Sequence, residues 1–172
     1  MRKINLQDRG SDLEEVSREI ETNLIGPVRM VKQFLPHLKS QTASAIVNVS
    51  SGLAFVPFPI SPVYGATKAG LHSFTQSLRV QLKNTNIKVF ELAPPSTQTP
   101  LLNAFDPVEV KSSANMDVKK LARKAIEGFK KDRLEIMPGI SNVLKLMSRI
   151  APGLMSKATS GPVDAMLAQT KL

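Results

Sequence analysis

The first part of the chain carries apolar residues at helical spacing. Residues 1–10 are polar and show no periodicity, so we expect a loop there. Ser11 and Glu14 then form a capping-box pattern, which is typical of the start of a helix. The pattern predicts one long helix from residue 11 to about Lys39, with its apolar stripe at Leu13, Val16, Ile20, Leu24, Val28, Val31, Leu35 and Leu38.

Pro27 lies inside this predicted helix. Proline has no amide hydrogen, so the carbonyl of Asn23, four residues earlier, loses its usual backbone partner. We therefore expect the helix to kink at this point. The freed carbonyl is available for another hydrogen bond, and a bend that only wraps the helix around the core is the alternative interpretation.

Three short apolar runs indicate strands, and the first of them suits a parallel strand that is buried on both faces. They are Ala45–Val49, Ile87–Ala93 and Leu134–Met137. Residues 52–63 contain three prolines among apolar side chains, which excludes a central strand and a helix interior. An apolar loop is therefore expected there.

Helical patterns separate these runs. A helix is expected from Tyr64 to about Lys83, with an inward face made of Leu71, Phe74, Leu78 and Leu82. Residues 101–116 look irregular and are expected to form a loop near the site. The alternation of strands and helices predicts an α/β fold with a doubly wound, Rossmann-like parallel sheet.

The net charge of +9 raises the question of a nucleic-acid partner, because basic clusters neutralise phosphates. The stretch 111–133 carries eight basic side chains against three acidic ones. The same stretch is an amphipathic helix pattern, whose inward positions are Val118, Leu121, Ala122, Ala125, Ile126 and Phe129. We favour a solvated basic face over a nucleic-acid site, and attraction of an anionic substrate or a membrane surface stays open.

Composition excludes several kinds of site. The sequence has no cysteine, so it has no disulfides, no thiolate nucleophile and no cysteine-based zinc site. His37 and His72 are the only histidines, and neither has a metal-like spacing with other ligands, so no metal is expected. The sequence has no run of 18 apolar residues and no signal-peptide core, which predicts a cytoplasmic protein.

The candidate chemistry lies at the end of the first predicted strand and the start of the helix that follows. Tyr64 and Lys68 are four positions apart, which places them on one helical face. A phenol has a pKa of about 10, and a nearby ammonium lowers it by favouring the phenolate. Ser51 closes the strand, where its hydroxyl can bind a substrate oxygen that shares a proton with Tyr64. These groups suit carbonyl reduction or alcohol oxidation.

This order and spacing resembles the short-chain dehydrogenase/reductase (SDR) family. The runs IVNVSSGLAF and PVYGATKAGLHSFTQSLR are most similar to its bacterial DltE-like oxidoreductases, and the likeness extends from about Asn5 to about Glu135. The resemblance implies NAD(P)-dependent hydride transfer to or from a carbonyl or alcohol substrate. In this role Tyr64 is the general acid/base, and Ser51 orients the substrate. Lys68 lowers the pKa of Tyr64 and contacts the cofactor ribose. Asn23 matches a family asparagine whose carbonyl holds a water that supplies protons to the lysine.

The segment APPSTQTPL resembles the family's Pro-Gly-x-x-x-Thr stretch, which receives the nicotinamide carboxamide. Pro95 replaces the family's glycine here, and Thr97 replaces an aliphatic residue. The resemblance implies NAD or NADP as cofactor, with contacts from Tyr64, Lys68, Pro94, Thr97 and Thr99.

The resemblance also bears on organisation and partners. It implies a catalytic part over residues 1–139 and a homo-oligomer formed through the helices at 12–39 and 64–83. Residues 140–172 are methionine-rich and helical in pattern, with breaks expected at Pro152-Gly153 and Gly161-Pro162. We expect this extension to pack on the same domain or on another copy, and contact with a substrate pocket or a membrane surface is the alternative.

Half of the family's pattern is missing. Dinucleotide binding needs a Gly-rich turn after the first strand, and none of the nine glycines forms one. We expect only the carboxyl-terminal part of the fold, with an unpaired edge on the strand before Ser51. Such a chain is expected neither to bind NAD(P) well nor to turn over alone. The alternatives are a non-catalytic truncated relative that acts as an interaction or dimerisation protein, and a basic membrane or nucleic-acid binder.

Overall fold

The computed structural model describes residues 1–8, 13–104 and 115–169. Ser11 of the expected capping box and most of the loop expected at 101–116 lie outside these residues. In chain order the described elements are α1 (Leu13–Ile20), η1 (Glu21–Ile25), α2 (Gly26–Ser40), β1 (Ser44–Val49), η2 (Gly52–Ala54), α3 (Pro62–Gln81), β2 (Ile87–Leu92), η3 (Pro100–Ala104), α4 (Val118–Lys130), β3 (Glu135–Ile136), α5 (Ser141–Ile150) and α6 (Pro152–Gln169).

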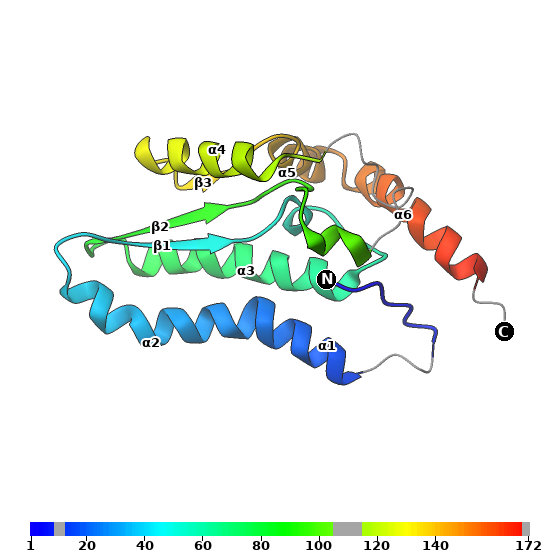
Figure 1. Ribbon diagram of the computed structural model, residues 1–172, viewed down its shortest axis with the longest axis horizontal. Helices are drawn as coiled ribbons and strands as arrows, with labels where there is room; N and C mark the ends of the chain where they lie inside the picture. Colours follow the sequence, from blue (N-terminus) through cyan, green and yellow to red (C-terminus); the bar gives the residue numbers. More distant parts are fainter. Residues whose placement is uncertain (9–12, 105–114, 170–172) are drawn as a thin grey trace.

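The long helix predicted near the start of the chain is present as α1, η1 and α2, which follow one another directly (Figure 1). The kink expected at Pro27 takes the form of a π-helical turn, η1, in which the amide of Gly26 donates to the carbonyl of Glu21. Pro27 is then the second residue of α2, where a missing amide hydrogen costs little. Asn23 lies in the middle of this turn.

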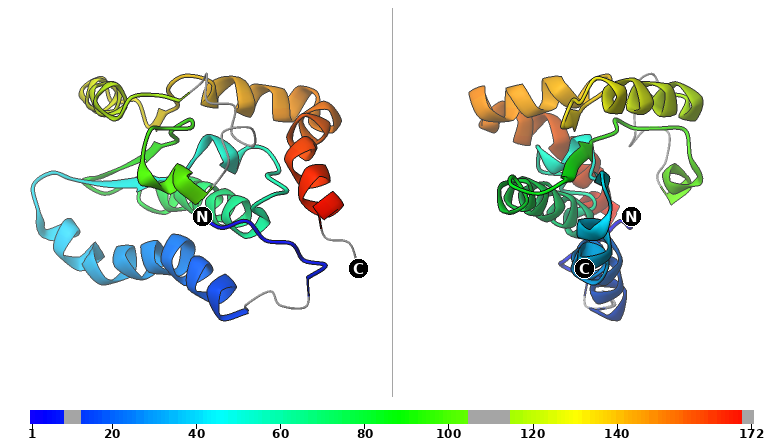
Figure 2. Two further views of the ribbon diagram at one scale, coloured as in Figure 1. Left: turned by 45° about the vertical axis from the view of Figure 1, so that its right-hand side comes forward. Right: turned by 90° about the vertical axis from the view of Figure 1, so that its left-hand side faces the viewer.

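The strands form a parallel sheet in the order β1-β2-β3 within the described part of the chain. Ser44 lies opposite Ile87, and Val49 lies opposite Leu92. The helices flank both faces, with α2 and α3 on one side and α4 on the other (Figures 1 and 2). The predicted α/β fold with a parallel sheet is therefore confirmed, and β1 is an edge strand among the described residues, as expected.

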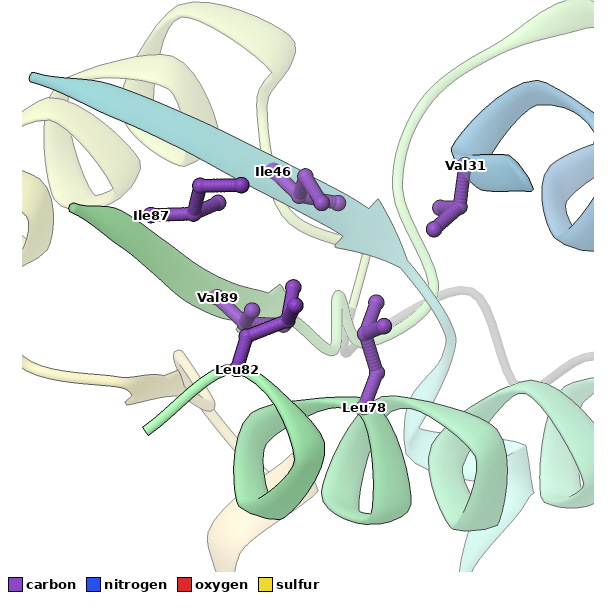
Figure 3. Packing of buried hydrophobic residues seen from close by; sticks show 6 residues of the cluster. All are labelled: Val31, Ile46, Leu78, Leu82, Ile87 and Val89. Carbon is purple, nitrogen blue, oxygen red and sulfur yellow. The ribbon is translucent and has the colours of Figure 1, made fainter. Parts of the chain in front are cut away.

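Alternation along the strands divides the core between the two faces of the sheet. On one face, Leu78 and Leu82 reach from α3 toward the strands, in the cluster formed by Val31, Ile46, Leu78, Leu82, Ile87 and Val89 (Figure 3). On the other face, α4 packs through Leu121, Ala125 and Phe129 on Leu92 and Ile136. The side chains predicted to point inward from α3 are thus in the core.

Three details of the helices differ from the sequence-based expectation. α3 begins at Pro62 instead of Tyr64, because the fixed φ of proline suits the first turn of a helix. Val118, Ala122 and Ile126 of α4 are exposed instead of facing inward, because the apolar stripe of α4 is wider than the part of the sheet that it covers. α6 continues through Pro162, so the second expected break is wrong, since one missing amide hydrogen did not end the helix.

The carboxyl-terminal residues are helical, as expected, and α5 ends just before Pro152. α5 packs on the short turn η2 that follows β1. Gly52 is needed at this contact, because a Cβ on it would lie 2.8 Å from the hydroxyl oxygen of Ser141. Among the described helices, none is both long and apolar enough to cross a membrane.

Candidate active site

The candidate site lies where β1 and β2 end and α3 begins. The amide of Gly52 donates to the carbonyl of Pro94 at 2.8 Å, which joins the ends of the two strands. Ser51 is buried, and its hydroxyl accepts a hydrogen bond from the amide of Leu53 at 3.1 Å. This contact caps η2 and holds the serine at the carboxyl end of the parallel strand, the usual position of sites in such sheets.

Tyr64 stands in the first turns of α3 and is only 8% exposed. Its phenol and the Ser51 hydroxyl share a side-chain hydrogen bond. The ammonium of Lys68 lies 5.6 Å from the centre of the Tyr64 ring and donates to the carbonyl of Val49 at 3.0 Å. The structure therefore brings Ser51, Tyr64 and Lys68 together, with α3 supplying the last two at the spacing that the sequence predicts.

The electrostatics of Tyr64 differ from the sequence-based expectation. Burial raises the pKa of the phenol above its ordinary value, the hydrogen bond with Ser51 lowers it, and the carboxylate of Glu19 raises it. The net shift is upward, so the predicted lowering by Lys68 is wrong for this chain. The reason is packing, because burial dominates and the Lys68 ammonium points to a backbone carbonyl while lying over the face of the ring.

Asn23 shares a groove with Lys68. The groove has a volume of about 390 Å³, runs between α2 and β1, and is otherwise mostly apolar, with Met30, Phe34, Val47 and Val49 among its lining residues. Asn23 enters it from the π-helical turn η1. Its use in a proton relay stays a prediction from the resemblance.

The residues predicted to bind the cofactor fall into two groups. Pro94 lies against Gly52 at the strand ends, next to Ser51. Thr97 and Thr99 lie on the segment beyond, where the Thr97 hydroxyl donates to the carbonyl of Pro95 at 2.8 Å and the Thr99 carbonyl accepts from Leu102. Both threonines therefore contribute to the turn of their own segment.

Sequence reasoning missed a buried network beside Ser51. The carboxylate of Glu91 is 1% exposed and accepts a hydrogen bond from the Ser50 hydroxyl at 2.5 Å. The same carboxylate lies 2.8 Å from Nδ1 of His72 on α3. A signal was present, since Glu91 is a carboxylate inside the apolar run IKVFELA, and a buried carboxylate needs partners.

A second missed residue is Glu19, on α1. It is 8% exposed, and one of its oxygens lies 3.0 Å from the α-amino nitrogen of Met1. Glu19 acts on both ionisable groups of the site: it raises the pKa of Lys68, although burial has the larger effect and lowers it. The sequence signal was a carboxylate next to Ile20 of the apolar stripe, one helical turn before Asn23.

The geometry and the sequence together define the class of protein. The family model described as short chain dehydrogenase matches residues 4–110, which is more than half of the chain. The chain therefore belongs to the short-chain dehydrogenase family.

Among its relatives is the uncharacterized oxidoreductase DltE of Bacillus subtilis (strain 168). The two are 41% identical over 118 residues, which cover 69% of this chain and 47% of DltE. The predicted membership and the likeness to DltE are thus confirmed. The chain spans less than half the length of this relative.

Solved structures agree with the fold. A short-chain dehydrogenase from Sphingobium yanoikuyae in complex with NADPH has a TM-score of 0.72 at 26% identity, covering 91% of this chain and 61% of that protein. A short chain dehydrogenase from Burkholderia cenocepacia J2315 in complex with NADP has a TM-score of 0.74 at 22% identity, covering 91% and 65%. A nicotinamide cofactor is therefore characteristic of relatives of this chain.

Proposed function

We propose that this chain carries the acid–base site of an NAD(P)-dependent oxidoreductase that acts on a carbonyl or alcohol. The observation that carries the proposal is the buried phenol of Tyr64, hydrogen-bonded to Ser51 and covered by the Lys68 ammonium. Residues 1–139 form the catalytic part in this proposal, and 140–172 form a helical extension. A cytoplasmic location and a homo-oligomer formed through the helices at 12–39 and 64–83 belong to the same proposal.

Each side chain has a role that its surroundings support. A phenol is protonated near neutral pH, so Tyr64 is in the form that can donate a proton to a carbonyl oxygen, although burial raises its pKa and makes it a weaker acid. Ser51 donates a hydrogen bond to the same oxygen and fixes its position. Lys68 lies over the Tyr64 ring, and the family resemblance assigns it the ribose of the cofactor. NAD(P)H, when bound, supplies the hydride that reduces the carbonyl carbon.

The residues present fit one end of the cofactor. Lys68 is partly buried beside the Tyr64 ring, and the strand ends offer a floor for a nicotinamide ring. We assign this end to Tyr64, Lys68, Pro94, Thr97 and Thr99. The sequence lacks the Gly-rich turn that binds a pyrophosphate, so we expect weak binding of NAD or NADP by the chain alone.

A chimera tests the function. The part of DltE that precedes the matched region is joined to this chain, and NADH- or NADPH-dependent reduction of an aldehyde and ketone panel is measured. We expect turnover by the chimera, and Tyr64→Phe in it is expected to lower the rate about 10²- to 10⁴-fold, with a much smaller effect on cofactor affinity because only the hydroxyl is lost and Lys68, Pro94, Thr97 and Thr99 stay in place. A folded chimera that binds cofactor and yet reduces no member of the panel, or full activity of the Phe variant, contradicts the proposal.

A second function, from another class, is supported by the open edge of β1. β1 is an edge strand among the described residues, and an uncovered edge is a template for another strand. Val47 and Val49 are 43% and 48% exposed, so one face of this strand is open as well. In this second proposal the chain acts as an interaction or dimerisation protein. Titration calorimetry of the DltE chimera with NADH and NADPH separates the two functions, since stoichiometric binding favours the enzyme and self-association without cofactor binding favours the interaction protein.

A further inference from the structure

Glu91 connects two parts of the candidate site. Its carboxylate accepts from the Ser50 hydroxyl at 2.5 Å and lies 2.8 Å from Nδ1 of His72, and its side chain is 1% exposed. An ionised carboxylate only accepts hydrogen bonds, so Nδ1 of His72 is the donor. Ser50 directly follows β1 and precedes Ser51. His72 is on α3, about two helical turns after Tyr64. One buried carboxylate thus joins the strand that leads to Ser51 to the helix that carries Tyr64.

This contact belongs to a polar stripe on the inner face of α3. Four polar side chains follow one another at intervals of three or four residues, so they share one helical face: Lys68, His72, Thr75 and Arg79. In the same order, their partners at 2.8–3.1 Å are the Val49 carbonyl, the Glu91 carboxylate, the Asn48 amide and the Val89 carbonyl. Apolar packing is non-directional, whereas a hydrogen bond requires a narrow range of distance and angle. The stripe therefore fixes how α3 is placed and turned on the strands.

The backbone at the strand ends does not fix α3. The amides of Ser50 and Gly52 donate to the carbonyls of Leu92 and Pro94 at 2.9 and 2.8 Å, which joins β1 to β2. Neither of these two bonds reaches the helix. The side chains of α3 therefore decide where Tyr64 stands relative to the strand ends.

We propose that Glu91 is a positioning residue of the acid–base site, which holds the Ser51 hydroxyl next to the Tyr64 phenol by binding Ser50 and His72 at the same time. Among the four contacts of the stripe, the His72 contact is the one whose partner side chain also binds the neighbour of Ser51. A displacement of about 1 Å at a reacting group lowers a rate by up to about 10²-fold, so such a bridge has a measurable effect. The inference rests on the proposed function, because a reaction at Tyr64 gives the fixed distance its use.

The sequence makes a direct test available. Tyr64 is the only tyrosine and there is no tryptophan, so tyrosinate absorbance reports this phenol alone. The hydrogen bond with Ser51 lowers the pKa of Tyr64, so weakening it moves the titration midpoint to higher pH. Ser50→Ala and His72→Leu each remove one contact of the bridge, and we expect both to raise the midpoint. Circular dichroism at each pH confirms the fold, and 3-fluorotyrosine in place of tyrosine moves the titration to milder conditions.

Ser51→Ala separates positioning from electrostatics. This variant removes the hydrogen bond itself, so it gives the largest upward shift that loss of the contact between Ser51 and Tyr64 produces. In the Ser51→Ala background, neither Ser50→Ala nor His72→Leu should shift the midpoint further, whereas a purely electrostatic effect of the altered bridge would persist. His72→Asn, whose amide nitrogen stands at the position of Nδ1, should restore the wild-type midpoint.

Arg79→Met is the matched control. It removes a polar contact of the same stripe near the other end of α3, far from Tyr64, and keeps most of the aliphatic stem. We expect it to leave the midpoint unchanged although it lowers the free energy of unfolding. An unchanged midpoint in folded Ser50→Ala or His72→Leu, a further shift in the Ser51→Ala background, or an equal shift in Arg79→Met overturns the proposal. Either bridge variant suffices if the other does not fold.

The same variants in the DltE chimera separate this inference from the proposed function. Ser50→Ala and His72→Leu should lower kcat about 10- to 10²-fold with KM for the carbonyl substrate little changed, and His72→Asn should recover most of the loss. An active chimera whose kcat does not fall sinks the inference and leaves the function intact. An inactive chimera, together with the expected midpoint shifts in the chain itself, supports the bridge and contradicts the function.

Discussion

The buried carboxylate of Glu91 should be among the most sensitive positions of the chain. Glu91→Ala removes the acceptor of the Ser50 hydroxyl and the partner of the His72 ring nitrogen, which lie 2.5 and 2.8 Å from it. Each buried polar group left without a partner costs about 1–3 kcal/mol. Together with the loss of a buried pair, the expected loss of unfolding free energy is about 3–5 kcal/mol.

Two control variants show how large the loss of unfolding free energy in Glu91→Ala is relative to milder changes. Glu91→Gln keeps the size of the side chain, an acceptor for Ser50 and a donor for His72, so it should cost only about 1–3 kcal/mol through loss of charged hydrogen bonds. Lys88→Ala on the same strand removes an exposed pair with Asp132, which is worth about 0–1 kcal/mol. Urea unfolding followed by circular dichroism measures all three, with an unchanged m-value as the check on two-state behaviour. A Glu91→Ala protein within about 1 kcal/mol of wild type would refute the reasoning.

Three further predictions concern acid, packing and the sheet edge. Burial raises the pKa of Glu135, but the hydrogen bond and charge of Lys145 outweigh burial and hold this pKa below 4.5. The stability that the ionised carboxylate contributes above that pH should therefore be lost as the pH falls. In acid unfolding curves, Glu135→Gln should make this loss smaller. Gly128→Ala should lower the free energy of unfolding measured in urea by about 1–3 kcal/mol, because its Cβ would lie 2.5 Å from the side chain of Ile136. Gly161→Ala is the control: its Cβ would meet no neighbouring element within 4 Å, so it should be neutral or stabilising. Val47→Lys on the β1 edge should reduce concentration-dependent self-association in analytical ultracentrifugation; equal association would contradict the edge as the contact.

The fold was predictable where the sequence pattern depends on local rules. The runs that end at Val49 and Leu92 are mostly apolar, and they form the parallel strands β1 and β2, as predicted. The expected burial on both faces is wrong for β1, whose side chains alternate between buried and exposed, because one face of this edge strand is left open. Tyr64 and Lys68 share a face because the helix period is fixed.

The candidate site was less predictable because its chemistry depends on packing between distant segments. The direction of the Tyr64 pKa shift is set by burial and by Glu19, and neither follows from the spacing of Tyr64 and Lys68. His72 looked like an ordinary helix residue, since its partner Glu91 lies on another element. The turn before Pro27 shows a similar limit, because the proline predicts a disturbed helix but not that a π-helical turn will absorb it.

The contacts that fix the acid–base site are separable from those that a full cofactor site requires. Ser50 is tied to β2 through Glu91, Gly52 to the carbonyl of Pro94, and Lys68 to the carbonyl of Val49, so β1, β2 and α3 alone hold the geometry. The groove that holds Lys68 runs along the uncovered edge of β1. Any strand that pairs with this edge must therefore lie next to Lys68. Pairing a strand with β1 would thus also cover the side of the reactive site that holds this lysine.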